Sequence, residues 1–150
     1  MPQLMPLDLL RLVALDNEDL AVVSAHLQDS VVRIDDLAYL PRERRFAVCA
    51  RRFDWEGPPD EPPRRRLTAL HFERVLACRT RGIDRKRRSA ALNLLAVTFA
   101  ETDAPSGMIT LLFSEGAIQL DVECVEVQMK DMGPVWEAER RPQHPELERA

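Results

Sequence analysis

The apolar residues near the start of the chain recur at the spacing of an amphipathic helix. A short apolar run at 9–15 comes first and is followed by Asp16, a residue type that commonly caps a helix. Leu20, Val23 and Leu27 then fall on one helical face. The sequence therefore predicts a first strand and, after it, an N-terminal helix with one apolar stripe against the core.

A second apolar stripe lies near the end of the chain and precedes Gly133 and Pro134, which together stop a helix. Its members are three or four positions apart: Val122, Val125, Met129 and Met132. We therefore expect a C-terminal helix that begins at Asp121 or Val122 and packs this stripe across a sheet.

Most of the chain between these two helices has the patterns of strands. Segment 67–81 alternates apolar and polar residues, and 90–99 is apolar on both faces, as in a central strand. Segment 108–122 is typical of a hairpin, with Glu115-Gly116 at the tip supplying a positive φ. The prolines of 57–63 lack the donors of a strand ladder and predict a surface loop. Seven or eight strands with short connections favour antiparallel pairing.

These elements predict an α+β fold in a single domain over 1–136. We expect a bent antiparallel sheet or a partly open β-barrel, with the N-terminal and C-terminal helices packed on it. That order of elements resembles pleckstrin-homology-like barrels. Residues 137–150 are polar and interrupted by prolines, which predicts a disordered tail.

The composition is that of a soluble globular protein: 150 residues, 45% of them hydrophobic and 31% charged. No apolar run reaches the ~18–20 residues of a membrane span, and the first residues lack the features of a signal peptide, so we expect no membrane association. The three cysteines are widely spaced and fit no disulfide framework or zinc site. We therefore expect a cytoplasmic protein.

The charge is strongly uneven along the chain, although the net charge is only −4. Segment 64–88 carries ten basic and two acidic residues, whereas the remainder carries 11 basic and 23 acidic residues. A two-signed surface of this kind can steer an acidic partner or pair with a second copy of the chain.

The sharpest candidate site is the basic rim, a set of six residues at a strand end and the turn after it. They are Arg79, Arg81, Arg85, Lys86, Arg87 and Arg88. Guanidinium groups there can grip carboxylates or phosphates in pairs of hydrogen bonds. A solvated hairpin tip that prevents edge aggregation is the simpler interpretation. Aromatic content of 5% and a pI near 5.4 make nucleic acid a weaker candidate than an acidic protein.

No other residues form a pattern typical of catalysis or metal binding. His26 and Asp29 are three apart on the predicted helix, and His71 and Glu73 share one strand face, but neither pair has a third partner. We therefore expect no catalytic residue, no metal site and no cofactor.

Five segments carry a resemblance to a known family: Leu12–Ser30, Ala38-Tyr-Leu-Pro41, Arg44-Arg-Phe46, Arg52-Phe-Asp-Trp55 and Gly116–Val125. Together they resemble the bacterial family catalogued as domain of unknown function 2948 (DUF2948). The resemblance implies a cytoplasmic protein of alphaproteobacteria. It carries over no catalytic residue.

The leading functional hypothesis is a cytoplasmic binding or adaptor module without catalytic activity. Its partner would be an acidic protein or a second copy of the chain. Two alternatives remain open at this point. One is an RNA- or nucleotide-associated protein that uses the basic rim at 79–88. The other is an enzyme with a shallow site at the mouth of the barrel.

Overall fold

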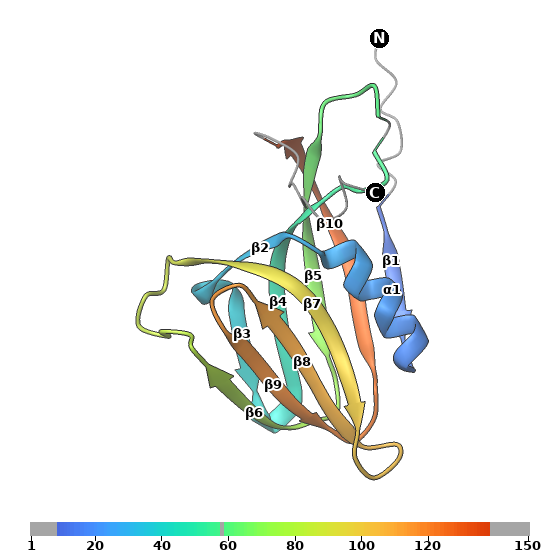
Figure 1. Cartoon of the computed structure of the whole chain (residues 1–150), viewed down its shortest axis with the longest axis vertical. Coiled ribbons are helices and arrows are strands. Elements are labelled where there is room, and N and C mark those ends of the chain that lie inside the picture. Colours follow the sequence, from blue (N-terminus) through green and yellow to red (C-terminus); the bar gives the residue numbers. More distant parts are fainter. Residues whose placement is uncertain (1–8, 58, 139–150) are drawn as a thin grey trace, which may run out of the picture.

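The computed structural model describes residues 9–57 and 59–138, which form ten strands and one α-helix (Figure 1). The strands are β1 (Arg11–Ala14), β2 (Ser30–Arg33), β3 (Leu37–Leu40), β4 (Arg45–Phe53), β5 (Arg64–Phe72), β6 (Val75–Arg81), β7 (Ala91–Glu101), β8 (Gly107–Phe113), β9 (Ala117–Val122) and β10 (Val127–Glu137). The helices are α1 (Asn17–Leu27) and the short 3-10 turns η1 (Ile34–Asp36) and η2 (Pro41–Glu43).

All ten strands belong to one sheet in which every pair is antiparallel. The strand order is β1-β10-β5-β4-β2-β7-β8-β9-β6, and β3 branches from β4. Figure 1 shows that the sheet curls on itself, so that β6 at one end of this order comes round toward β3. The curled sheet therefore encloses its own core.

The branch arises because β4 shares one of its edges between two strands. Along its other edge, β4 pairs with β5 from Phe46 to Phe53. On the shared edge, residues 45–48 pair with β3 and Arg51 pairs with Val31 of β2. The sheet continues through β2 into β7, so β3 is left as a short edge strand.

The core lies between the two halves of the curled sheet. Phe46 of β4 and Phe72 of β5 face it with ring centroids 6.3 Å apart, and Leu111 of β8 and Ile118 of β9 face it from the opposite half. Helix α1 packs mainly against β7, with smaller contacts to β1 and β4. It buries Leu20 and two further apolar residues there.

The helix α1 lies where the sequence predicted one. The side chain of Asp16 accepts a hydrogen bond from the Asp19 N–H at 2.8 Å, which caps its first turn. Ser24 ties the helix to the sheet, because its Oγ accepts from the Val97 N–H at 2.8 Å. No helix in the described part of the chain is long and apolar enough to cross a membrane.

The predicted C-terminal helix is wrong, and with it the α+β fold class and the pleckstrin-homology-like arrangement. The segment forms the strand β10, which pairs with β5 on one edge and β1 on the other. Val127, Met129 and Asp131 are buried while Gln128 and Lys130 are not, so the true period is two. The apparent helical stripe joins residues of β9, of the bend after it and of β10.

The predicted strand at 67–81 is also wrong in its extent, since it is two strands joined by a turn. Glu73 and Arg74 form the turn between β5 and β6, with Arg74 at φ 61°. Leu76 of β6 has 52% of its surface exposed. At the 115–116 hairpin Gly116 has no positive φ; a Cβ there would lie 2.1 Å from the carbonyl oxygen of Arg81. Close approach of the backbone therefore requires this glycine.

The predicted polar tail, 137–150, lies outside the described residues from 139 onward. Its first two residues continue the folded chain. Glu137 is the last residue of β10, and Ala138 is buried and donates its N–H to the carbonyl of Pro63 at 2.8 Å.

A buried ion pair ties together β4, β5, β10 and the residue that precedes β1. Asp131 of β10 is 1% exposed and Arg52 of β4 is 3% exposed; two hydrogen bonds of 2.9 and 2.8 Å connect them. Asp131 also accepts from the hydroxyl of Thr68 at 2.7 Å and from the Leu10 N–H at 2.9 Å. Burial raises the pKa of Asp131, but these hydrogen bonds outweigh it and hold the pKa below its usual range.

We predict that Asp131→Asn lowers the free energy of unfolding by about 3 kcal/mol at pH 7, because it leaves the buried Arg52 without its counter-charge. Asp121 forms a similar pair with Arg79 on the surface, so Asp121→Asn should cost less than about 1 kcal/mol. Urea unfolding of both variants and wild type measures this difference.

The pH dependence follows from the lowered pKa of Asp131. The stability that a lowered pKa provides is present above the pKa of the unfolded carboxyl and is lost as pH falls through the folded value. The advantage of wild type over Asp131→Asn should therefore shrink below about pH 4. Equal losses in the two variants, or a difference that does not change with pH, would contradict the role assigned to this pair.

Candidate functional site

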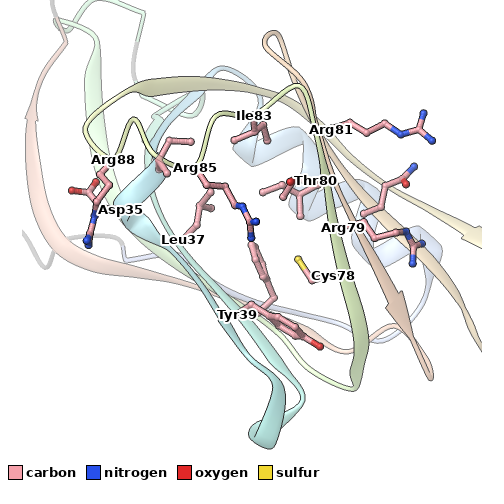
Figure 2. Close-up of a pocket in the computed structure, with 14 residues that line it drawn as sticks. Asp35, Leu37, Tyr39, Cys78, Arg79, Thr80, Arg81, Ile83, Arg85 and Arg88 are labelled. Atoms are coloured by element: carbon pink, nitrogen blue, oxygen red, sulfur yellow. The ribbon is translucent and has the colours of Figure 1, made fainter.

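A cavity of about 740 Å³ opens between β3 and β6, the seam of the curled sheet (Figure 2). Among the described strands, β3 pairs with β4 alone and β6 with β9 alone, so the facing edges of the two strands make no ladder with each other. Side chains of both strands line the cavity from opposite sides. We call this space the seam cavity.

Main-chain hydrogen bonds close the seam at both of its ends. At one end the Val75 N–H donates to the carbonyl of Arg44 at 2.9 Å. At the other end the Ile34 N–H donates to Ala90 at 3.1 Å and the Asp35 N–H donates to Arg88 at 2.9 Å. The opening is therefore a window with backbone on every side.

The deep part of the seam cavity is apolar. Ile34, Phe46 and Ile118 line it and are 8%, 3% and 1% exposed, so its floor is the surface of the hydrophobic core. Leu37 of β3 and Ile83 of the 82–90 loop add apolar surface nearer the opening. A ligand that reaches this floor must present apolar groups to it.

The charged part lies at the mouth. Four of the six residues of the predicted basic rim line the seam cavity: Arg79, Arg81, Arg85 and Arg88. Arg87 instead lines a separate hollow of about 260 Å³ between the 82–90 loop and β7, and Lys86 lines neither space. The structure thus brings most of the predicted site together and separates two of its members from it.

The four cavity arginines differ in their direction and pairing. Arg85 extends from the 82–90 loop into the middle of the opening, whereas Arg79 and Arg81 lie on the opposite side of β6 from Cys78 and Thr80 (Figure 2). Arg79 donates two hydrogen bonds to Asp121 at 2.8 and 2.9 Å, which raise the pKa of Arg79 and lower that of Asp121. The positive charge of Arg79 is therefore offset by the carboxylate of Asp121.

No carboxylate in the described part of the chain forms an ion pair with Arg81, Arg85 or Arg88. Among the described residues of the lining, Asp35 has the one acidic side chain. Arg88 lies beside Asp35 and Arg81 points to the other side of β6, so the positive charge in the opening is that of Arg85. An anion placed there gains charge-assisted hydrogen bonds.

A family model described as a protein of unknown function (DUF2948) matches residues 10–144. The chain belongs to this family. The match spans both strands of the seam and all the residues that line the cavity. No curated protein and no solved structure matches the chain.

The lining of the DUF2948 cavity contains one thiol among its described residues, that of Cys78 on β6. Burial raises the pKa of this thiol, and the nearby charges of Arg85 and Arg79 offset part of that rise. A thiol with a raised pKa carries little thiolate at neutral pH and is a weak nucleophile. The raised pKa therefore disfavours Cys78 as a nucleophile.

The histidines considered from the sequence do not reach the seam cavity. The imidazole of His26 lies 3.7 Å from the carboxylate of Glu56, and the carboxylate of Glu73 accepts a hydrogen bond from Arg45 at 2.7 Å. Among residues 9–57 and 59–138, no three His, Cys, Asp or Glu side chains gather closely enough to hold a metal ion.

Sequence reasoning missed the apolar half of the site. Leu37 and Tyr39 of β3 line the cavity, as do Phe46 and Ile118, which lie on β4 and β9. The alternation of Leu37 and Tyr39 was a signal for a strand face. Nothing in the sequence showed that this face lies opposite β6.

We predict that the pKa of Cys78 lies above that of an ordinary thiol and that Arg85→Gln raises it further, because the substitution removes a nearby positive charge. Rates of alkylation by iodoacetamide across a pH series measure this value in a Cys49→Ser, Cys124→Ser background. Arg87→Gln is the matched control, since Arg87 does not line the cavity. If both arginine variants gave the same profile, the placement of Arg85 over the cavity would be wrong.

Proposed function

We propose that this DUF2948 chain is a binding module without catalytic activity whose ligand carries an anionic group into the seam cavity. The observation that carries the proposal is the position of Arg85, which extends over an apolar cavity and has no carboxylate partner among the described residues. An unpaired guanidinium at the mouth of a preformed cavity is suited to a ligand that supplies the missing counter-charge.

The size and lining of the cavity support a ligand of small-molecule dimensions or one side-chain group of a larger partner. Its volume of about 740 Å³ lies within the range of ~300–1,000 Å³ that ligand pockets occupy. Such pockets combine mostly apolar walls with a few placed polar groups. Here Ile34, Phe46 and Ile118 provide the walls, while Arg85 and Thr80 provide polar groups at the opening.

Two observations support binding rather than catalysis. The Cys78 thiol has a raised pKa, and neither His26 nor His71 is among the described residues that line the cavity with it. Acid–base chemistry needs a proton acceptor within hydrogen-bond reach of the reacting group. Asp35 is the one carboxylate among the lining residues that the structure describes, and it lies on the η1 turn beside Arg88 rather than beside the thiol (Figure 2).

We place the protein in the cytoplasm and expect its partner there. Cys49, Cys78 and Cys124 are free thiols, which suits a reducing compartment. An acidic side chain of a protein, or of a second copy of this chain, is one source of the anionic group. The acidic balance of the chain outside 64–88 is consistent with self-association.

A nucleotide or RNA phosphate is the second candidate for the ligand. The ring of Tyr39 lines the cavity and is partly exposed, so a base could stack there. The apolar floor favours it less, because the polar edges of a base would find no partners on Ile34, Phe46 and Ile118.

Thermal unfolding in the presence of a panel of anions tests the proposal. The panel contains mono- and dicarboxylates, sugar phosphates, AMP and hexaglutamate, each added to wild type, Arg85→Glu and Arg87→Glu. At about one hundred times its dissociation constant a ligand adds about 2.7 kcal/mol, which raises the Tm by roughly 5–10 °C for a chain of this size. We expect this shift in wild type and in Arg87→Glu, and its loss in Arg85→Glu.

The mutated residues are solvent-exposed and lie in a loop, so the unliganded Tm values should agree closely. Anion-induced shifts of equal size in wild type and Arg85→Glu, or no shift with any member of the panel, would contradict the proposal.

A further inference from the structure

The backbone window limits the shape of what can enter the seam cavity. A peptide strand that pairs with a sheet edge lies along that edge and must continue past at least one of its ends. Here the Val75–Arg44 contact closes one end and the Asp35–Arg88 contact closes the other. The four residues of β3 leave about 13 Å of edge between them. The window therefore suits a compact ligand that enters end-on, rather than a strand added along β3 or β6.

The cavity changes from apolar to charged between its floor and its mouth. Ile34, Phe46 and Ile118 are buried residues of the core. Thr80 and Arg85, by contrast, are exposed residues at the opening. A ligand that fills this space must have the same polarity gradient, apolar at its inner end and polar at its outer end.

The charge at the mouth of the cavity determines which chemical group the outer end of the ligand must carry. Arg85 points into the centre of the opening, and its planar guanidinium matches the two oxygens of a carboxylate. Arg88 lies at the rim beside Asp35 and the side chain of Arg81 lies on the other side of β6, so Arg85 is the group that meets an anion in the opening. A single negative group above an apolar body satisfies both halves of the cavity.

We infer that the ligand of the seam cavity is a single-chain amphiphilic acid, namely a carboxylate on an aliphatic chain that reaches Ile118 and Phe46 while its head group pairs with Arg85. This inference rests on the proposed function and deepens it by naming the ligand class. The length of the aliphatic chain affects the binding affinity, because each methylene buried on the floor adds its own transfer free energy. The head group adds the same free energy whatever the length of that chain.

Titration calorimetry with defined probes tests the inference. Octanoate, decanoate, decanol and acetate are each titrated into the full chain below the concentrations at which the probes form micelles. Burial of two more methylenes increases the binding affinity roughly 10- to 15-fold, so decanoate should bind that much more tightly than octanoate. Acetate lacks the chain and decanol lacks the charge, so both should bind far more weakly than decanoate.

Two variants separate the contributions of the head group and the chain. Arg85→Gln should weaken decanoate by at least about tenfold and leave decanol unchanged, because it removes charge-assisted hydrogen bonds to the head group alone. Thr80→Trp should weaken both probes, since Thr80 is exposed and its side chain points into the opening, where a larger side chain occupies ligand space. Arg87→Gln is the control and should bind every probe as wild type does, because Arg87 lines a different hollow.

The outcomes distinguish failure of this inference from failure of the proposed function. Arg85-dependent binding of AMP or hexaglutamate, with no dependence on chain length, would overturn the amphiphile and leave the anion-binding module standing. Equal binding of decanoate and decanol in wild type and Arg85→Gln would overturn both. Sedimentation with vesicles of phosphatidylglycerol, in a protein that does not bind decanoate, would assign the site to a membrane surface and overturn the soluble ligand.

Discussion

The shared edge of β4 is the constraint on which the rest of the architecture depends. One edge of a strand can pair with one neighbour at each position, so β3 and β2 divide that edge between them. Because the sheet continues through β2 only, β3 remains an edge strand, and β6 returns to face it without pairing. The seam cavity is the space that this arrangement leaves. Its unpaired backbone groups face an open cavity, where water can satisfy them.

Two arginine side chains of the molecule differ in burial and in pairing, and therefore in the role that each can have. Arg52 is buried and has its charge matched by Asp131, so it fastens β4 to β10. Arg85 is exposed and has no such match in the described residues. A buried arginine without a carboxylate would destabilise the fold, whereas an exposed one at a cavity mouth keeps its hydration. The difference in burial therefore separates a structural pair from a candidate binding group.

The sequence predicted local elements better than the way they meet. Asp16 and the stripe of Leu20, Val23 and Leu27 located α1, because capping and helical spacing are both local signals. The C-terminal helix failed because Val122 and Val125 precede β10 and happen to be spaced like Met129 and Met132 beyond them. Within β10 the true alternation runs over only a few residues, and its hydrogen-bond partners on β1 and β5 lie far away in sequence.

The candidate site also has one part that the sequence predicted and one part that it did not. The basic rim was visible as a run of arginines, and four of its residues line the cavity. The apolar floor was not visible, because Ile34, Phe46 and Ile118 are ordinary core residues until the curl of the sheet brings them beneath Arg85. Which arginines are free to meet a ligand also depended on distant carboxylates, as the pairing of Arg79 with Asp121 shows.

The seam cavity keeps its shape only while the main-chain hydrogen bonds at the two ends of the window are formed. Two of them tie the η1 turn to residues 88 and 90, at the far end of the loop that carries Arg85. If these contacts broke by local opening, the loop would leave the sheet and take the guanidinium of Arg85 with it, so the opened form would have no intact site. A ligand that binds the closed form alone must hold the loop in place by mass action. The fraction of protein with a bound ligand and the fraction with an ordered 82–90 loop would therefore rise and fall together.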